Sequence, residues 1–70
     1  MPEEFSIIVN GESREAKSGE TVSTLLLNLG MEGGRVAIER NLQILPRARW
    51  PETQLQPGDR FEIVHFVGGG

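Results

Sequence analysis

One short stripe of apolar residues with helical periodicity restricts the fold of this chain more than any other feature. The stripe recurs at i, i+3, i+4 and i+7, in Val22, Leu25, Leu26 and Leu29. Thr21 precedes it as an N-cap residue, and Gly30 ends it. A helix of about eight residues is not stable by itself in water, so its apolar face must pack against a sheet. The rest of the chain has to supply that sheet.

The remaining apolar residues alternate as β-strands do. An opening hairpin is predicted over residues 5–17, because Asn10-Gly11 readily adopts the positive φ angles of a type I′ turn. Its polar return strand, residues 12–17, is expected at a sheet edge. Short strands are predicted over residues 36–39 and 43–45, with a turn over residues 39–41 between them. An irregular stretch containing Leu55 and a type II turn at Pro57-Gly58 lead to a last, central strand within residues 60–67.

This order of elements predicts an α+β fold with β-grasp architecture. A mixed sheet of four to five strands would be covered on one face by one main helix. A right-handed crossover through the helix is expected to set the third strand parallel to a neighbour, and closing the sheet is expected to bring the last strand beside the first. Seventy residues are too few for two independently packed domains. Residues 1–67 are therefore predicted to form one domain, and residues 68–70 a flexible glycine tail.

Composition excludes several classes of function. The chain has no cysteine and a single histidine, His65, which rules out thiolate metal centres, disulfide scaffolds and cysteine nucleophiles. Basic residues are scattered among acidic ones at a net charge of −3, which argues against a nucleic-acid partner. Apolar runs are far shorter than the roughly 20 residues that span a bilayer, and no signal-peptide pattern is present. We expect a cytoplasmic protein with no membrane partner, metal site, stably bound cofactor or catalytic residues.

The chemistry is expected in the last three residues, Gly68, Gly69 and Gly70. Such a tail is thin enough to enter a narrow channel and costs much backbone entropy to order. The reactive group that it would deliver is the α-carboxylate of Gly70. A carboxylate is a poor electrophile until a nucleotide converts it into a mixed anhydride, after which a sulfur nucleophile could leave a thiocarboxylate. The alternative interpretation is a frayed end.

A docking surface is predicted at the root of this tail. Val64 and Phe66 lie in the strand phase opposite Phe61 and Ile63, so a helix that covers the second pair leaves the first pair exposed. An exposed apolar patch there is typical of an interaction surface. The alternative is a twist, a bulge or an error in the predicted register that returns Val64 and Phe66 to the core.

Other candidates are interpreted as structural. His65 has no nearby carboxylate in the sequence to orient it as an acid or base. Trp50 is interpreted as a lid over one end of the core rather than as an exposed anchor, because so small a domain has few large apolar residues. Gly33-Gly34 lacks the spacing of a phosphate-binding loop and is predicted to be a turn.

Three segments resemble those of a known family. They are residues 36–41, Ile44-Leu45-Pro46-Arg47 with Trp50, Thr53 and Leu55, and residues 58–70, of which the last is the most specific. They are similar to the ThiS family, the sulfur carriers of thiamin biosynthesis within the ThiS/MoaD group. The resemblance extends from the Asn10-Gly11 hairpin to the end of the chain, and it implies a ubiquitin-like β-grasp fold.

The resemblance also implies a reaction sequence. An E1-like, ATP-dependent adenylyltransferase of the ThiF type would adenylate Gly70, and a persulfide enzyme would supply sulfur for the thiocarboxylate. A thiazole synthase of the ThiG type would then accept that sulfur. Gly69 would complete the terminal pair, with Gly68 before it, and ATP would be used by the partner enzyme. Two alternatives stay open: a carrier for molybdopterin synthesis, and a β-grasp binding module that does not use its terminus.

Overall fold

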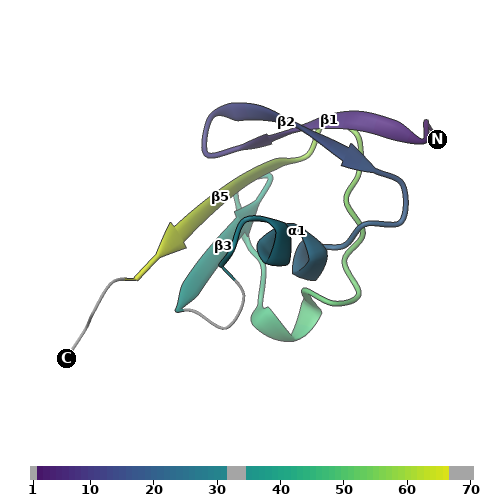
Figure 1. Ribbon diagram of the computed structural model, residues 1–70. Coiled ribbons are helices and arrows are strands. Elements are labelled where there is room, and N and C mark those ends of the chain that lie inside the picture. The colour runs from purple at the N-terminus through teal and green to yellow at the C-terminus, as the bar shows by residue number, and fades with distance from the viewer. Residues whose placement is uncertain (1, 32–34, 67–70) are drawn as a thin grey trace.

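The computed structural model describes residues 2–31 and 35–66. Over these residues the chain forms five strands, one α-helix and one 3-10 helix. In chain order they are β1 (Glu4–Val9), β2 (Glu12–Lys17), α1 (Val22–Asn28), β3 (Val36–Arg40), β4 (Gln43–Ile44), η1 (Arg47–Arg49) and β5 (Arg60–His65). The helix lies across one face of the sheet (Figure 1). No helix in the described ranges is long and apolar enough to span a membrane.

The opening hairpin has the predicted geometry. Strands β1 and β2 pair antiparallel from Glu4↔Lys17 to Val9↔Glu12. At the turn, Asn10 has a φ of 50° and Gly11 a φ of 84°, the left-handed backbone that a type I′ turn requires at both positions. Strand β2 lies at a sheet edge, as its polar sequence predicted.

Helix α1 begins and ends where the sequence indicated. The side chain of Thr21 accepts a hydrogen bond from the Thr24 amide, and the Thr24 hydroxyl accepts one from the Thr21 amide, which makes a capping box. Gly30 follows the helix with a φ of 74°. Val22, Leu25 and Leu26 are buried, whereas Leu27, which falls outside the stripe, is exposed. The apolar face of α1 therefore packs on the sheet as predicted.

The strand order β2-β1-β5-β3-β4 places the last strand in the centre, as predicted. Strand β5 runs parallel to β1 (Ile8↔Arg60, Val9↔Phe61) and antiparallel to β3. The expectation that the third strand is parallel to a neighbour is wrong, because both neighbours of β3, β4 and β5, are antiparallel to it. The α1 crossover does return β3 in the direction of β2, but β1 and β5 lie between those two strands.

The core fills the space between α1 and the sheet. It also receives two residues from the irregular segment between β4 and β5, Trp50 and Leu55, both buried. The Trp50 indole Nε1 donates a hydrogen bond to the Leu45 carbonyl at 3.0 Å, and the Arg47 guanidinium lies 4.7 Å from the centre of the indole ring. Trp50 is therefore part of the core, as predicted, and not an exposed anchor.

The connection between β3 and β4 differs from the prediction. Strand β3 continues through Arg40, and the turn is made by Asn41 and Leu42 with φ angles of 52° and 72°. The exposed Leu42 thus occupies a backbone conformation that usually favours glycine or asparagine. Strand β4 is correspondingly short, ending at Ile44.

Candidate functional site

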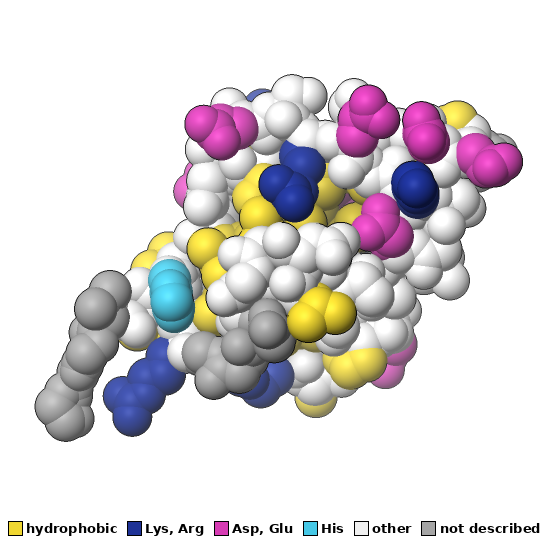
Figure 2. All heavy atoms as spheres, in the orientation of Figure 1, with side chains coloured by type: hydrophobic (Ala, Val, Ile, Leu, Met, Phe, Trp, Pro, Cys, Tyr) yellow, Lys and Arg dark blue, Asp and Glu magenta, His cyan; other side chains and the backbone are white. Residues whose placement is uncertain are grey.

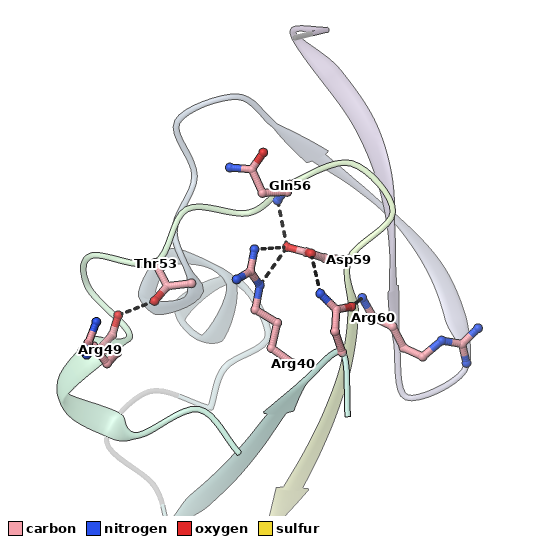
Figure 3. A network of polar contacts seen from close by, with 7 residues as sticks. Arg40, Arg49, Thr53, Gln56, Asp59 and Arg60 are labelled. Atoms are coloured by element: carbon pink, nitrogen blue, oxygen red, sulfur yellow. Dashed lines mark hydrogen bonds and ion pairs between the residues drawn. The ribbon is translucent and has the colours of Figure 1, made fainter. Parts of the chain in front are cut away.

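A buried carboxylate fixes the beginning of β5. Asp59 follows the Pro57-Gly58 turn, in which Gly58 has a φ of 80°. Its Oδ2 accepts hydrogen bonds from the Gln56 amide at 2.9 Å and from Arg40 Nε and Nη2 at 3.1 and 3.0 Å (Figure 3). Its Oδ1 accepts one from Asn41 Nδ2 at 3.1 Å. Asp59 is only 4% exposed, so its charge would be costly alone, but it accepts four hydrogen bonds, two of them from the Arg40 cation.

Sequence reasoning missed this network. The available signal was an aspartate directly after a Pro-Gly turn, because Asp side chains commonly accept hydrogen bonds from the backbone of their own turn. The involvement of Arg40 and Asn41 required knowledge that β3 ends beside β5. Those pairings depend on the register of the sheet, which the local sequence does not specify.

The side chains of two asparagines hold β5 farther along. Asn41 Oδ1 accepts a hydrogen bond from the Arg60 amide at 3.0 Å. In the first hairpin, Asn10 Oδ1 accepts from the Ile63 amide at 2.7 Å, and Asn10 Nδ2 donates to the Ile63 carbonyl at 3.2 Å. The Asn10 side chain thus continues the pairing of β1 with β5 after β1 itself has turned away. Strand β5 is thus held as far as Ile63 on its β1 edge and as far as the Phe66 amide on its β3 edge.

The end of β5 exposes the predicted apolar pair. Phe61 and Ile63 are buried, whereas Val64 and Phe66 are each 54% exposed. The Phe66 amide still donates to the Arg35 carbonyl at 2.8 Å, so the alternation is not interrupted by a bulge. The predicted phase is confirmed, and the alternative that returns both residues to the core is wrong. Their role in docking stays a prediction.

The remaining predicted site residues are not described by the structure. Gly68, Gly69 and Gly70 lie outside the described residues, as does the Gly33-Gly34 pair. The boundary between residues 1–67 and 68–70 also stays a prediction, as does the role of Gly70. His65 is exposed, and its side chain forms no hydrogen bond or ion pair with another described residue.

The helix side of the domain is a weaker candidate for a binding or catalytic site. A hollow of about 160 Å³ lies between the first hairpin and the end of α1, bordered by Val9, Arg14, Leu29 and Met31. Figure 2 shows apolar side chains exposed in this hollow beneath a basic one. Within residues 2–31 and 35–66, no three His, Asp or Glu side chains are grouped so that they could hold a metal ion. The exposed end of β5 is therefore the better candidate site.

Comparison with known proteins agrees with this assignment. The model of the ThiS family matches residues 7–70. The sulfur carrier protein ThiS of Bacillus subtilis is 43% identical over 54 residues, which cover 77% of this chain and 82% of that protein. The ThiS of Escherichia coli is 31% identical over 66 residues, 94% of this chain and all of that protein. The thiazole synthase of Paramagnetospirillum magneticum is 42% identical over 66 residues, but the chain spans only 20% of its length.

A solved structure matches the fold as well. The crystal structure of the thiamine biosynthesis protein ThiS from Geobacter metallireducens has a TM-score of 0.73 and 30% sequence identity. The match covers 94% of this chain and all of the other. The sheet order, the single covering helix and the family match over residues 7–70 lead to one conclusion. The chain belongs to the ThiS family and has its ubiquitin-like β-grasp fold.

Proposed function

We propose that this chain is a sulfur carrier of thiamin biosynthesis and acts as a protein cosubstrate rather than as an enzyme. The observation that carries the proposal is the end of β5: a central strand, held on both edges, ends at the exposed pair Val64 and Phe66. Val67 and then three glycines follow this pair in the sequence. The names of the Bacillus subtilis and Escherichia coli relatives support the same function.

The carrier group in this proposal is the α-carboxylate of Gly70. Its oxygen attacks the α-phosphorus of ATP on a partner enzyme, and pyrophosphate leaves to give an acyl adenylate. The outer sulfur of an enzyme persulfide then displaces AMP at the acyl carbon and forms an acyl disulfide. A thiol cleaves its S–S bond, forms a new disulfide with the persulfide enzyme's cysteine sulfur, and leaves the thiocarboxylate on Gly70. The domain contributes no catalytic residue to these steps. Its contribution is to position the carboxylate, since correct placement of reacting groups alone supplies a large part of a rate enhancement.

Three partners follow from this chemistry. A ThiF-type adenylyltransferase binds ATP and activates Gly70, and a persulfide enzyme delivers the sulfur. A ThiG-type thiazole synthase consumes the thiocarboxylate. The 42% identity to segments of the thiazole synthases of Paramagnetospirillum magneticum and Magnetococcus marinus supports the last partner. Val64 and Phe66 provide the apolar contact through which the domain docks beside the channel that receives its glycines.

Shortening the tail tests the proposal. Deletion of Gly70 leaves Gly69 as the last residue, and one residue spans up to about 3.5 Å, so the carboxylate no longer reaches an adenylation centre set for the full length. Gly69→Leu keeps the length but adds bulk that blocks entry into a narrow channel. We expect both variants to lose pyrophosphate release from ATP in the presence of the ThiF-type enzyme. Their circular dichroism and melting curves should match those of the wild-type protein.

If the Gly70 deletion variant releases pyrophosphate at the wild-type rate, this result would contradict the carrier function and favour a binding module that uses its sheet face. The intact mass of the protein from its native cell gives a direct check. A mass in which one oxygen is replaced by sulfur, with the change located to the C-terminal fragment by accurate fragment masses, shows that Gly70 receives the sulfur.

A further inference from the structure

The hollow between the first hairpin and the end of α1 combines an apolar floor with a charged rim. Its volume is about 160 Å³, with Val9, Leu29 and Met31 as apolar border and Glu12 and Arg14 as charged border. Leu29 and Met31 pack against the hydrophobic core and are half-buried. Figure 2 shows apolar side chains at this place beneath a basic one. A small apolar surface therefore lies beside two opposite charges.

The register of the hairpin explains why charged side chains border this hollow. Arg14 pairs with Ile7 and Glu12 with Val9, and both of these β1 residues are buried. Directly paired residues share one face of a sheet, so Glu12 and Arg14 lie on the face that α1 covers. Ala16 in the same row is buried, whereas Glu12 and Arg14 are exposed. This face of β2 therefore changes from apolar to charged where the hollow begins.

Neither of these two charges is used inside the domain. No ion pair or side-chain hydrogen bond joins Glu12 or Arg14 to another residue in the described part of the chain. One residue of β2 separates them, so their Cα atoms lie about 6.5–7 Å apart and their side chains leave the same face of the strand. A carboxylate and a guanidinium are therefore both available to one small ligand.

We propose that this hollow binds an α-amino acid with an apolar side chain of about the size of leucine. The volume restricts the ligand, because pockets for drug-sized molecules measure about 300–1,000 Å³, whereas an apolar cavity of about 150 Å³ holds a molecule the size of benzene. Arg14 donates hydrogen bonds to the α-carboxylate, and Glu12 accepts them from the α-ammonium. The apolar side chain fills the hollow against Val9, Leu29 and Met31.

The opposite signs of the two rim charges select a zwitterion over a simple ion. An apolar carboxylate without an amine would place its charge near that of Glu12, and an apolar amine would place its charge near that of Arg14. Like charges repel, so each of these ligands gains one contact and suffers one repulsion. The site is also separate from the carrier chemistry, since none of the residues that border the hollow belongs to β5 or to the glycines.

The test is a titration of the full-length, ¹⁵N-labelled protein followed by NMR. Leucine has both charges and the apolar side chain, whereas leucinamide lacks the carboxylate, 4-methylpentanoate lacks the ammonium and glycine lacks the side chain. We expect leucine to shift the amide signals of Val9, Leu29 and Met31, with a dissociation constant on the order of 1 mM for so small a ligand. The other three ligands should each bind at least about threefold more weakly, because exposed charge contacts are individually modest.

Two charge variants assign the roles of the rim residues. Arg14→Gln should weaken leucine binding about three- to fivefold without weakening the binding of leucinamide. Glu12→Gln should weaken leucine binding to a similar extent without weakening the binding of 4-methylpentanoate. Lys17→Gln and Glu15→Gln are the matched controls, because both side chains are exposed on the opposite face of β2. The controls should change the affinity for leucine by less than about 1.5-fold, since water and salt screen their charges.

Three outcomes would overturn the inference. The first is that leucine leaves the signals of Val9, Leu29 and Met31 unshifted. The second is that uncharged N-acetylleucinamide binds as tightly as leucine, which would assign the hollow to an apolar side chain of a partner protein. The third is that both rim variants bind leucine as the wild type does. Each result concerns the hollow alone, so the carrier function is tested separately by pyrophosphate release.

Discussion

Replacement of Asp59 by asparagine should be among the most damaging isosteric changes in this domain. The asparagine keeps the shape of the side chain but removes the charge that faces Arg40 and turns one acceptor into a donor. If the new amide group points toward Asn41, the Asn41 Nδ2 loses its acceptor, which was at 3.1 Å. Asn41 cannot rotate its amide to compensate, since its Oδ1 already accepts from the Arg60 amide at 3.0 Å. The opposite orientation instead places the new donor against the Gln56 amide.

The magnitude follows from these contacts. One buried donor without a partner costs about 1–3 kcal/mol. The loss of the charge-assisted bonds to Arg40 adds about 1 kcal/mol, less than for a fully buried pair because the Arg40 side chain is 29% exposed and can be hydrated. We therefore expect the free energy of unfolding to fall by about 3 kcal/mol. The free energy of unfolding of a domain of this size is on the order of 4–10 kcal/mol, so the expected loss is a large part of its stability.

Urea unfolding followed by tryptophan fluorescence measures this effect. Trp50 is the sole tryptophan and is buried, so its emission reports exposure of the core. Glu52→Gln is the matched control, since it breaks an ion pair in which both side chains are 66% exposed, and it should change stability by less than about 0.5 kcal/mol. An Arg40→Met variant and the double variant complete a thermodynamic cycle. If Asp59→Asn unfolds at the same urea concentration as Glu52→Gln, the network contributes nothing and the reasoning is refuted.

Two further predictions concern the core and the docking surface. Leu26→Ala should lower the free energy of unfolding by about 2–5 kcal/mol, because Leu26 is buried. Leu27→Ala, on the exposed face of α1, should unfold near the wild-type urea midpoint. Equal effects of the two substitutions would contradict the assigned helix face. Phe66→Asp should weaken binding to the adenylating enzyme at least about tenfold while the protein still melts as a folded domain, and outright unfolding would show that Phe66 belongs to the core.

Local patterns in the sequence predicted most of the elements. The Asn10-Gly11 turn and the Val22 to Leu29 stripe depend on residues within one or two turns of each other, and both were correct. The alternation around Ile63 also predicted the two faces of β5, because in a regular strand the phase is set by the strand itself. These features require no knowledge of distant contacts.

The errors occurred where distant segments meet. The parallel neighbour assigned to the third strand was wrong because β5, the last strand in the chain, inserts between β1 and β3. Leu55 lies in an irregular segment, where no periodic pattern could predict its burial, yet the residue is buried in the core. No role was predicted for Asp59, whose four hydrogen bonds depend on where β3 ends. Long-range pairing of this kind is not encoded in any short window of sequence.

Strand β5 is built to withstand tension. Its neighbour β1 is parallel to it, so a force directed along β5 at Phe66, with β1 held at Glu4, loads the contacts between the two strands in shear. Several hydrogen bonds must then break together rather than one after another. They run from the Ile8 amide to the Asp59 carbonyl, from the Asn10 amide to the Phe61 carbonyl, and between the Asn10 side chain and the Ile63 backbone. A pull along β5 against a fixed β1 is therefore resisted by several hydrogen bonds at once, whereas a force that peeled the two strands apart would break them singly.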